Sequence, residues 1–76
     1  MQRSRSVKLT GKQVQILELL ASGKTDNAVA IEMGRSLDTI RYHKKNIFNI
    51  LSAGCTVEAI VKALKLNLIS LDHVDF

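Results

Sequence analysis

The chain contains no proline and no tryptophan, and among its 76 residues only four are glycine and one is cysteine. The lack of proline and the low glycine content favour helices joined by short connections. A single cysteine, Cys55, cannot form a disulfide within the chain, and no Cys/His spacing resembles a zinc site. We therefore expect a helical domain in a reducing compartment, with no metal and no cofactor.

Long apolar runs are also absent. No stretch approaches the roughly 20 apolar residues that span a bilayer, and the opening "MQRSRSVKLTG" lacks the apolar centre of a signal peptide. A chain of this length forms one small domain, short of what most enzymes need to build a cleft. Paired carboxylates, a nucleophile with a base and a phosphate loop are all missing from the sequence. We expect a cytoplasmic, nucleoid-associated binding module with no membrane partner, and not an enzyme.

Positive charge is present in two separate places. The formal net charge is +4, and the cations gather without acids in residues 1–12 and 41–49. They are Arg3, Arg5, Lys8 and Lys12 in the first group and Arg41, Lys44 and Lys45 in the second. Such clusters suit a surface that binds phosphates, although a charge run is more often only a solvated face. Residues 1–8 are predicted to be a flexible basic arm.

Local signals predict the first two helices. Thr10 and Gln13 have the spacing of a capping box, which starts a helix, and Gly23 supplies a left-handed end. The second helix is expected to begin near Thr25 or Asp26 and to stop at Gly34. Its predicted core residues are Val29, Ala30 and Met33.

The third and fourth helices follow from similar signals. Ser36 is predicted to cap a helix over Leu37–Leu51, which "SAG" ends at Gly54, and Thr56 to cap a helix that includes Val57–Leu66 and stops at Asn67. A short helix, a glycine turn and a longer helix form a helix-turn-helix. The predicted fold is all-α, a four-helix domain over residues 9–69 with a central helix-turn-helix, followed by a tail over 70–76.

A helical wheel separates two faces of the third helix. The inner face is apolar and also contains a histidine: Ile40, His43, Ile47, Ile50 and Leu51. The outer face is polar: Asp38, Arg41, Tyr42, Lys45 and Asn49. Lys44 lies on the flank of the inner face, where it can bury its stem and lift its ammonium outward.

His43 has a structural and a catalytic interpretation. Catalysis requires an acid or a nucleophile beside the imidazole, and the sequence neighbours are lysines and Asn46. A packed histidine that bonds a backbone carbonyl is therefore favoured.

The outer face also has two interpretations. It is either a solvated face or, as the second helix of a helix-turn-helix, a surface that enters the major groove. In the groove, Arg41 can bind guanine, and Lys45 can reach guanine or a phosphate. Tyr42 can contact a thymine methyl or a phosphate, and Asp38 can accept from a cytosine amine or repel a wrong register.

The fourth helix is apolar nearly all round. Ala59, Ile60 and Ala63 form one stripe, and a second stripe at the spacing of a helix-helix seam consists of Val57, Val61, Leu64 and Leu68. The second stripe predicts a dimer interface. The alternative is that it packs on the rest of the same domain or on the tail.

Taken together, these residues resemble the LuxR-type (GerE-type) helix-turn-helix domain of bacterial transcription regulators over residues 9–69. The resemblance is carried by many positions: Leu9-Thr10, Leu20-Ala21-x-Gly23, Ala30, Ser36-x-x-Thr39-Ile40, His43, Asn46-Ile47, Leu51, Glu58-Ala59-Ile60, Ala63 and Leu68-Ile69.

The resemblance implies a domain that binds double-stranded DNA as a homodimer to control transcription, with RNA polymerase or a larger regulator as further partners. It implies base contacts at Arg41, Tyr42 and Lys45. Implied phosphate contacts lie around the starts of the two motif helices: Thr25, Asn27, Ser36 and Thr39. Lys44 is added from its flank position, and Arg35 from its charge.

Three positions depart from the family pattern. Ala28 stands where a glutamate is usual, Arg35 replaces an apolar turn residue, and Gln13 replaces a glutamate. The first two make the phosphate-facing edge more basic, and Arg35 puts the packing of the turn in question.

The main hypothesis is thus a sequence-specific transcription regulator. The rival is an interaction protein of the same fold, which pairs through the fourth helix with a larger regulator and modulates it without reading DNA. The operator, the sign of regulation and the input signal do not follow from these residues.

Overall fold

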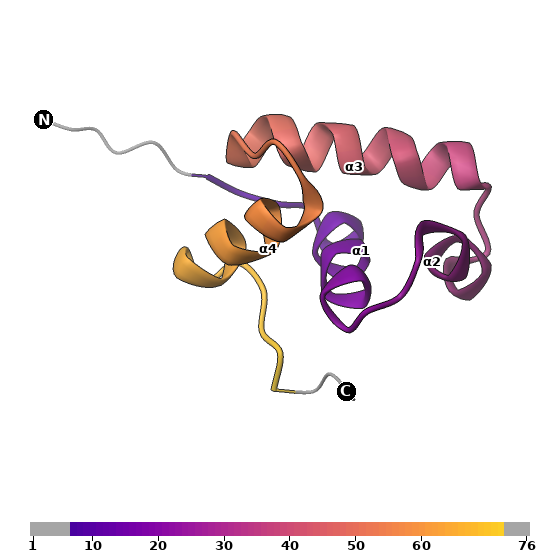
Figure 1. The fold of residues 1–76 in the computed structure, drawn as a ribbon, viewed down its shortest axis with the longest axis horizontal. Coiled ribbons are helices and arrows are strands. Elements are labelled where there is room, and N and C mark those ends of the chain that lie inside the picture. The colour runs from indigo at the N-terminus through magenta and orange to yellow at the C-terminus, as the bar shows by residue number, and fades with distance from the viewer. Residues whose placement is uncertain (1–6, 73–76) are drawn as a thin grey trace, which may run out of the picture.

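The structure, a computed structural model, describes residues 7–72, which form four α-helices and no strand. The helices are α1 (Gly11–Ala21), α2 (Asp26–Met33), α3 (Leu37–Leu51) and α4 (Thr56–Lys65). In Figure 1, α3 lies across the top, with α1, α2 and α4 below it. The prediction of an all-α fold with a central helix-turn-helix is confirmed. Residues 1–6 of the predicted arm and 73–76 of the predicted tail lie outside the described residues.

Side-chain caps start the first three helices, and two of them, Thr10 and Ser36, are the predicted ones. In α1, the Gln13 backbone N–H donates to Thr10 Oγ1 at 3.1 Å, while Gln13 Oε1 accepts from the Thr10 N–H at 2.9 Å. Thr25 and Ser36 accept from the backbone N–H three residues on, each at 3.1 Å. Each cap satisfies a donor that the first helical turn leaves unpaired.

The start of α4 differs from the prediction. The N-cap residue is Cys55, whose side chain makes no capping hydrogen bond, and Thr56 is already the first helical residue. The prediction that Thr56 caps this helix is therefore wrong. The preceding turn is held instead by Glu58, whose Oε1 accepts from the Gly54 N–H at 2.8 Å.

All four helices end in the same way. The residue that reverses the chain has a positive φ, and the N–H of the next residue donates to the carbonyl five residues back, which is the Schellman motif. The reversing residues are Gly23 (φ 97°), Gly34 (φ 66°), Ser52 (φ 53°) and Asn67 (φ 58°). The closing bonds are Lys24 to Leu19 at 3.3 Å, and Arg35 to Ala30, Ala53 to Phe48 and Leu68 to Ala63 at 2.9 Å.

The ends of α3 and α2 test two predictions about the turns that follow these helices. Helix α3 has the predicted bounds, but the chain is reversed after it by Ser52 and not by the predicted Gly54, so a non-glycine residue adopts the left-handed conformation. The turn after α2 keeps its backbone bonds although the Arg35 side chain is exposed. The motif therefore forms without an apolar residue at position 35.

One apolar core joins the four helices. Its buried members are Ile16, Leu17, Leu20, Val29, Ala30, Ile40, Ile47, Leu51, Ala59, Ala63 and Ile69. Met33 and Ile60 are half-buried against this core. So is Val7, which lies within the predicted arm.

Two residues placed on the inner face of α3 lie at its edge. Ile50 is 38% exposed and His43 is half-buried, so the prediction that Ile50 is a core residue is wrong. At about 100° per residue, His43 lies about 60° and Ile50 about 80° from the buried Ile40 around the helix axis. The core is therefore narrower than the wheel suggested.

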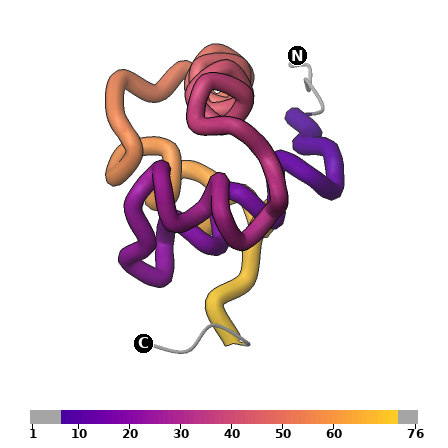
Figure 2. Tube along the Cα trace, turned by 90° about the vertical axis from the view of Figure 1, so that its right-hand side faces the viewer, coloured from indigo at the N-terminus to yellow at the C-terminus, as the bar shows by residue number. Residues whose placement is uncertain are grey.

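The other described helices leave the outer face of α3 uncovered. Helix α3 contacts α1, α2 and α4, and the end-on view in Figure 2 shows all three on the same side of it. No single helix among the described residues is long and apolar enough to cross a membrane, and only α3 and α4 together, bent by 52°, pass that test.

Replacing Ser52 by glycine should stabilise the fold. A side chain in the left-handed region costs roughly 1–2 kcal/mol, which glycine avoids, while its greater unfolded-state entropy offsets part of the gain. We expect Ser52→Gly to raise the free energy of unfolding by about 0.5–1 kcal/mol, measured by urea denaturation. The matched control, Gly34→Ala, should lower it by a similar amount. A destabilised Ser52→Gly variant would contradict this account of the turn.

Candidate nucleic-acid interface

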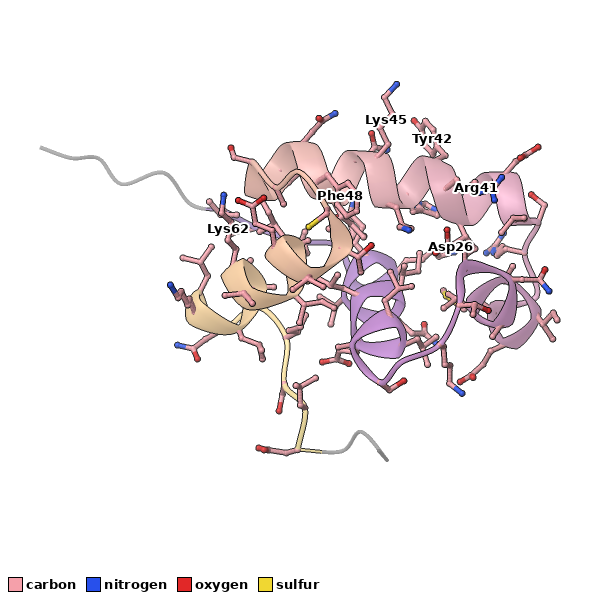
Figure 3. All side chains as sticks on the ribbon, in the orientation of Figure 1. Asp26, Arg41, Tyr42, Lys45, Phe48 and Lys62 are labelled. Atoms are coloured by element: carbon pink, nitrogen blue, oxygen red, sulfur yellow. The ribbon has the colours of Figure 1, made fainter. Side chains whose placement is uncertain are left out.

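The outer face of α3 presents the predicted base-contact residues to solvent. Asp38, Arg41, Tyr42 and Lys45 are all exposed, with Tyr42 at 63%. Figure 3 shows Tyr42 and Lys45 projecting from α3 away from the other helices. Because the opposite side of α3 is buried, the direction of these side chains is fixed relative to the domain. The structure thus gathers two cations, one aromatic residue and one acid on the exposed side of a single helix.

The predicted phosphate-contact residues surround the starts of α2 and α3. Asn27 and Arg35 are exposed. The hydroxyls of Thr25 and Ser36 accept capping hydrogen bonds, and Ser36 Oγ lies 2.9 Å from Thr39 Oγ1. A hydroxyl that accepts a bond still has a proton to donate. These residues therefore offer donors beside the N-termini of two helices, where an anion is favoured.

Lys44 does not lift its ammonium outward as predicted. Its Nζ donates to both carboxylate oxygens of Asp26, at 2.9 and 3.1 Å, and lies 5.8 Å from the centre of the Phe48 ring. The pair ties the first residue of α2 to the middle of α3. That prediction of its direction is wrong, because a carboxylate from another helix lies within reach of the flank.

His43 is packed as the structural interpretation expected, with a different partner. Its ring lies edge to face against Tyr42, with 5.9 Å between the ring centres. No hydrogen bond from the imidazole to a backbone carbonyl occurs within the described residues, so that detail was wrong. Nor do three His, Cys, Asp or Glu side chains come together as metal ligands anywhere in residues 7–72.

An open cleft of about 500 Å³ runs along the flank of α3. It is lined by Asp26, Arg41, Lys44, Lys45, Phe48, Asn49 and Ala53. Two cations that form no ion pair within the described part of the chain, Arg41 and Lys45, and the Asn49 amide line this cleft beside the Asp26–Lys44 pair, and the excess of positive charge suits an anionic ligand. No binding role was predicted for Asp26, Phe48 or Asn49. Helical periodicity was the only sequence signal that could place Phe48 near Arg41 and Asn49 near Lys45. No signal from neighbouring residues in the sequence indicated that Asp26 lines the cleft.

The outer stripe of α4 is largely exposed. Val57, Val61 and Leu64 are 69%, 45% and 37% exposed, whereas Leu68 is half-buried against the core. Leu68 leaves the predicted stripe because α4 ends at Lys65, before it. The exposed surface that remains is a run of large apolar side chains on one helix, which is typical of an interaction face.

Glu58 holds the turn between α3 and α4. Its carboxylate accepts from the Gly54 N–H at 2.8 Å and pairs with Lys62 at 3.3 Å, and Lys62 Nζ also donates to the Ser52 carbonyl at 2.6 Å. The backbone hydrogen bond, followed by the Lys62 ammonium, lowers the pKa of Glu58 below its ordinary value of 4.5. This clamp orients α4 relative to α3.

Comparison with known proteins agrees with the geometry. The bacterial regulatory proteins of the luxR family match residues 7–63. The solved structure of the transcription factor GerE superposes with a TM-score of 0.80 at 32% identity, covering 90% of this chain and 100% of that one.

Two curated relatives are also similar. The transcriptional regulatory protein YdfI of Bacillus subtilis (strain 168) is 31% identical over 65 residues, which cover 86% of this chain and 30% of the relative. The transcriptional activator protein PhzR of Pseudomonas fluorescens is 32% identical over 63 residues, covering 83% and 26%. The chain thus spans less than a third of the length of these relatives.

The fold and the exposed basic helix define a four-helix domain of the helix-turn-helix class. Within that class, the match over residues 7–63 places the chain in the luxR family of bacterial regulatory proteins. The resemblance inferred from the sequence is confirmed.

Protonation of Glu58 should weaken the turn before α4. Because its pKa is lower in the folded protein than the ordinary 4.5, its contribution is fully present above that value. It is lost as the pH falls through the lowered pKa of the folded state. We expect the stability difference between the wild type and Glu58→Gln to shrink between about pH 6 and about pH 3.

The measurement is urea denaturation at each pH. Glu32→Gln is the control, since Glu32 pairs with Lys24 at 3.5 Å on the exposed side of α2 and holds no backbone group. An unchanged difference across this range would show that the Glu58 carboxylate does not hold the turn.

Proposed function

We propose that this chain is a sequence-specific DNA-binding domain of a transcription regulator that reads the major groove with α3. The observation that carries the proposal is the uncovered outer face of α3, where Arg41, Tyr42 and Lys45 are all exposed on a helix-turn-helix. The 15 residues of α3 form a helix about 22 Å long and, with its side chains, about 10–12 Å across. This diameter fits the major groove, which is roughly 12 Å wide. Membership of the luxR family supports this function.

In this proposal, base edges are read by Arg41, Tyr42 and Lys45, with Asp38 accepting from a cytosine amine or rejecting other registers. The phosphates on either side are bound by donors at the starts of α2 and α3. These donors are Thr25, Asn27, Arg35, Ser36 and Thr39. Exposed cations on this edge add electrostatic affinity that depends on salt concentration. A role of this kind places the protein in the cytoplasm, at the nucleoid.

The exposed stripe of α4 gives the proposal its second part, a homodimer. Val57, Val61 and Leu64 present an apolar surface that a second copy of the same helix would cover. A two-fold pair of α4 helices would place two copies of α3 on inverted half-sites. RNA polymerase or a larger regulator would be a further partner of the bound dimer.

Removing the two long cations from the outer face of α3 should strongly weaken specific recognition. A good base contact of this kind discriminates by about 1–3 kcal/mol. We therefore expect Arg41→Ala with Lys45→Ala to weaken binding to a selected operator by roughly 30-fold or more. The operator would come from selection on a random duplex pool, and affinity from fluorescence anisotropy.

The matched control is Lys24→Ala with Lys65→Ala, which removes the same charge from exposed positions off this face. Equal losses in the two double variants would mean that only net charge matters, and would contradict base reading. Duplex binding by the wild type with no salt dependence, or none at all, would favour the rival function. In that case the exposed α4 surface would serve pairing with a larger regulator.

Charge placed on the α4 stripe should break the dimer. We expect Val61→Glu to be monomeric at concentrations where the wild type is dimeric, measured by sedimentation equilibrium, because burying an unpaired carboxylate in an apolar interface is costly. Ile31→Glu is the control, since Ile31 is 73% exposed on α2, outside the stripe. A dimer that survives Val61→Glu would rule out this face.

A further inference from the structure

The cleft beside α3 already contains an anion supplied by the protein. Asp26, the first residue of α2, lies beneath α3 in Figure 3, and its carboxylate forms part of the cleft lining together with Arg41, Lys44 and Lys45. Among the described residues, Lys44 alone of these three cations forms an ion pair. The cleft therefore presents two free cations and one that is held by an internal carboxylate.

The Asp26–Lys44 pair is more enclosed than the other ion pairs of the domain. Its side chains are 26% and 19% exposed, compared with 48% and 42% for Glu32 and Lys24. Lys44 Nζ bonds both carboxylate oxygens, at 2.9 and 3.1 Å, and lies over the Phe48 ring. A pair with two bonds and little solvent is weakened by salt much less than an exposed pair.

We propose that Asp26 competes with DNA phosphate for Lys44 and thereby limits the electrostatic affinity of the domain for duplex DNA. A phosphate that took Lys44 would leave the Asp26 carboxylate unpaired in a partly buried position, facing a second anion. Both effects oppose the exchange. Lys44 therefore makes no phosphate contact in the wild-type complex, although it lines the same cleft as Arg41 and Lys45. This inference rests on the proposed DNA binding.

The pair also has a consequence for how the domain discriminates. Non-specific binding is supplied almost wholly by phosphate contacts, whereas an operator adds base contacts. A domain with one phosphate contact fewer relies more on the base contacts of Arg41, Tyr42 and Lys45. Asp26 is thus a specificity-determining residue that touches no base.

The salt dependence of binding tests the proposal. Each phosphate neutralised adds about 0.9 to the slope of log affinity against log salt concentration. We expect Asp26→Asn to bind a random-sequence duplex more tightly than the wild type at low salt, with a slope steeper by about 0.9. Asparagine keeps an oxygen that can accept from Lys44, so the packing of α2 on α3 is retained. Asp26→Ser, which also removes the carboxylate, is a second variant if asparagine destabilises the fold.

Two further variants identify the source of the change. In Asp26→Asn with Lys44→Met, the slope should return to that of the wild type, because the freed cation is gone. Glu32→Gln is the control, because it raises the net charge by the same amount but frees Lys24 in place of Lys44. Lys24 follows the C-terminal end of α1, and Figure 1 shows that this end points away from α3. The slope of Glu32→Gln should equal that of the wild type.

The outcomes separate this inference from the proposed function. If the wild type binds duplex with a salt-dependent affinity and Asp26→Asn or Asp26→Ser has the same slope, the competition is overturned and DNA binding stands. A steeper slope that persists in the double variant would also overturn it, because the added contact would not come from Lys44. A wild type without salt-dependent binding overturns both proposals together.

Discussion

The burial of one side of α3 is the constraint on which the outer surface depends. Ile40 and Ile47 are completely buried and Leu51 nearly so, and each such side chain contributes about 1.5–3 kcal/mol of transfer free energy. Because a helix is a rigid unit, three anchored positions along about three turns fix both the axis and the rotation of α3. The directions of Arg41 and Lys45 follow from that rotation. The buried core beneath α3 thus fixes the positions of the side chains that would have to contact a partner in one register.

Small residues on the other helices make this burial possible. Ala30 on α2 and Ala59 and Ala63 on α4 are all buried at the core, and short side chains let neighbouring helix axes come close. In α4 the arrangement has a second effect, because the bulky Val57 and Val61 are left on the outer side. The helix therefore uses its small residues within the domain and its large ones outside it.

Much of this fold was readable from the sequence because the signals that set the helices are local. The Thr10–Gln13 box and the Ser36 cap each join residues three positions apart, so spacing alone predicts them. Helix α3 has the predicted bounds for that reason. The exposed positions Asp38, Arg41, Tyr42 and Lys45 follow from helical periodicity once the apolar stripe is known.

The misses involve interactions between elements or the edges of a pattern. The Asp26–Lys44 pair joins residues 18 positions apart on two helices, and no spacing rule announces it. Leu68 was extrapolated along a helix that stops at Lys65, after which Asn67 turns the chain. Ile50 was placed on the inner face by the helical wheel, but it lies about 80° from Ile40, beyond the width of the core, and is 38% exposed. In each case the outcome depended on how one segment of the chain is positioned relative to the rest of the fold, which local sequence signals do not give.

The repeated helix ending has a consequence for how the chain reaches this structure. Each helix is closed by bonds within six residues, and each connection is short, so successive helices are brought together without closing a long loop. Rates of folding rise as the sequence separation of contacts falls, and helical domains of this kind fold in microseconds to milliseconds. A newly synthesised copy would therefore spend little time with its apolar helix faces unprotected. The same four turns that set the architecture also keep its folding pathway short.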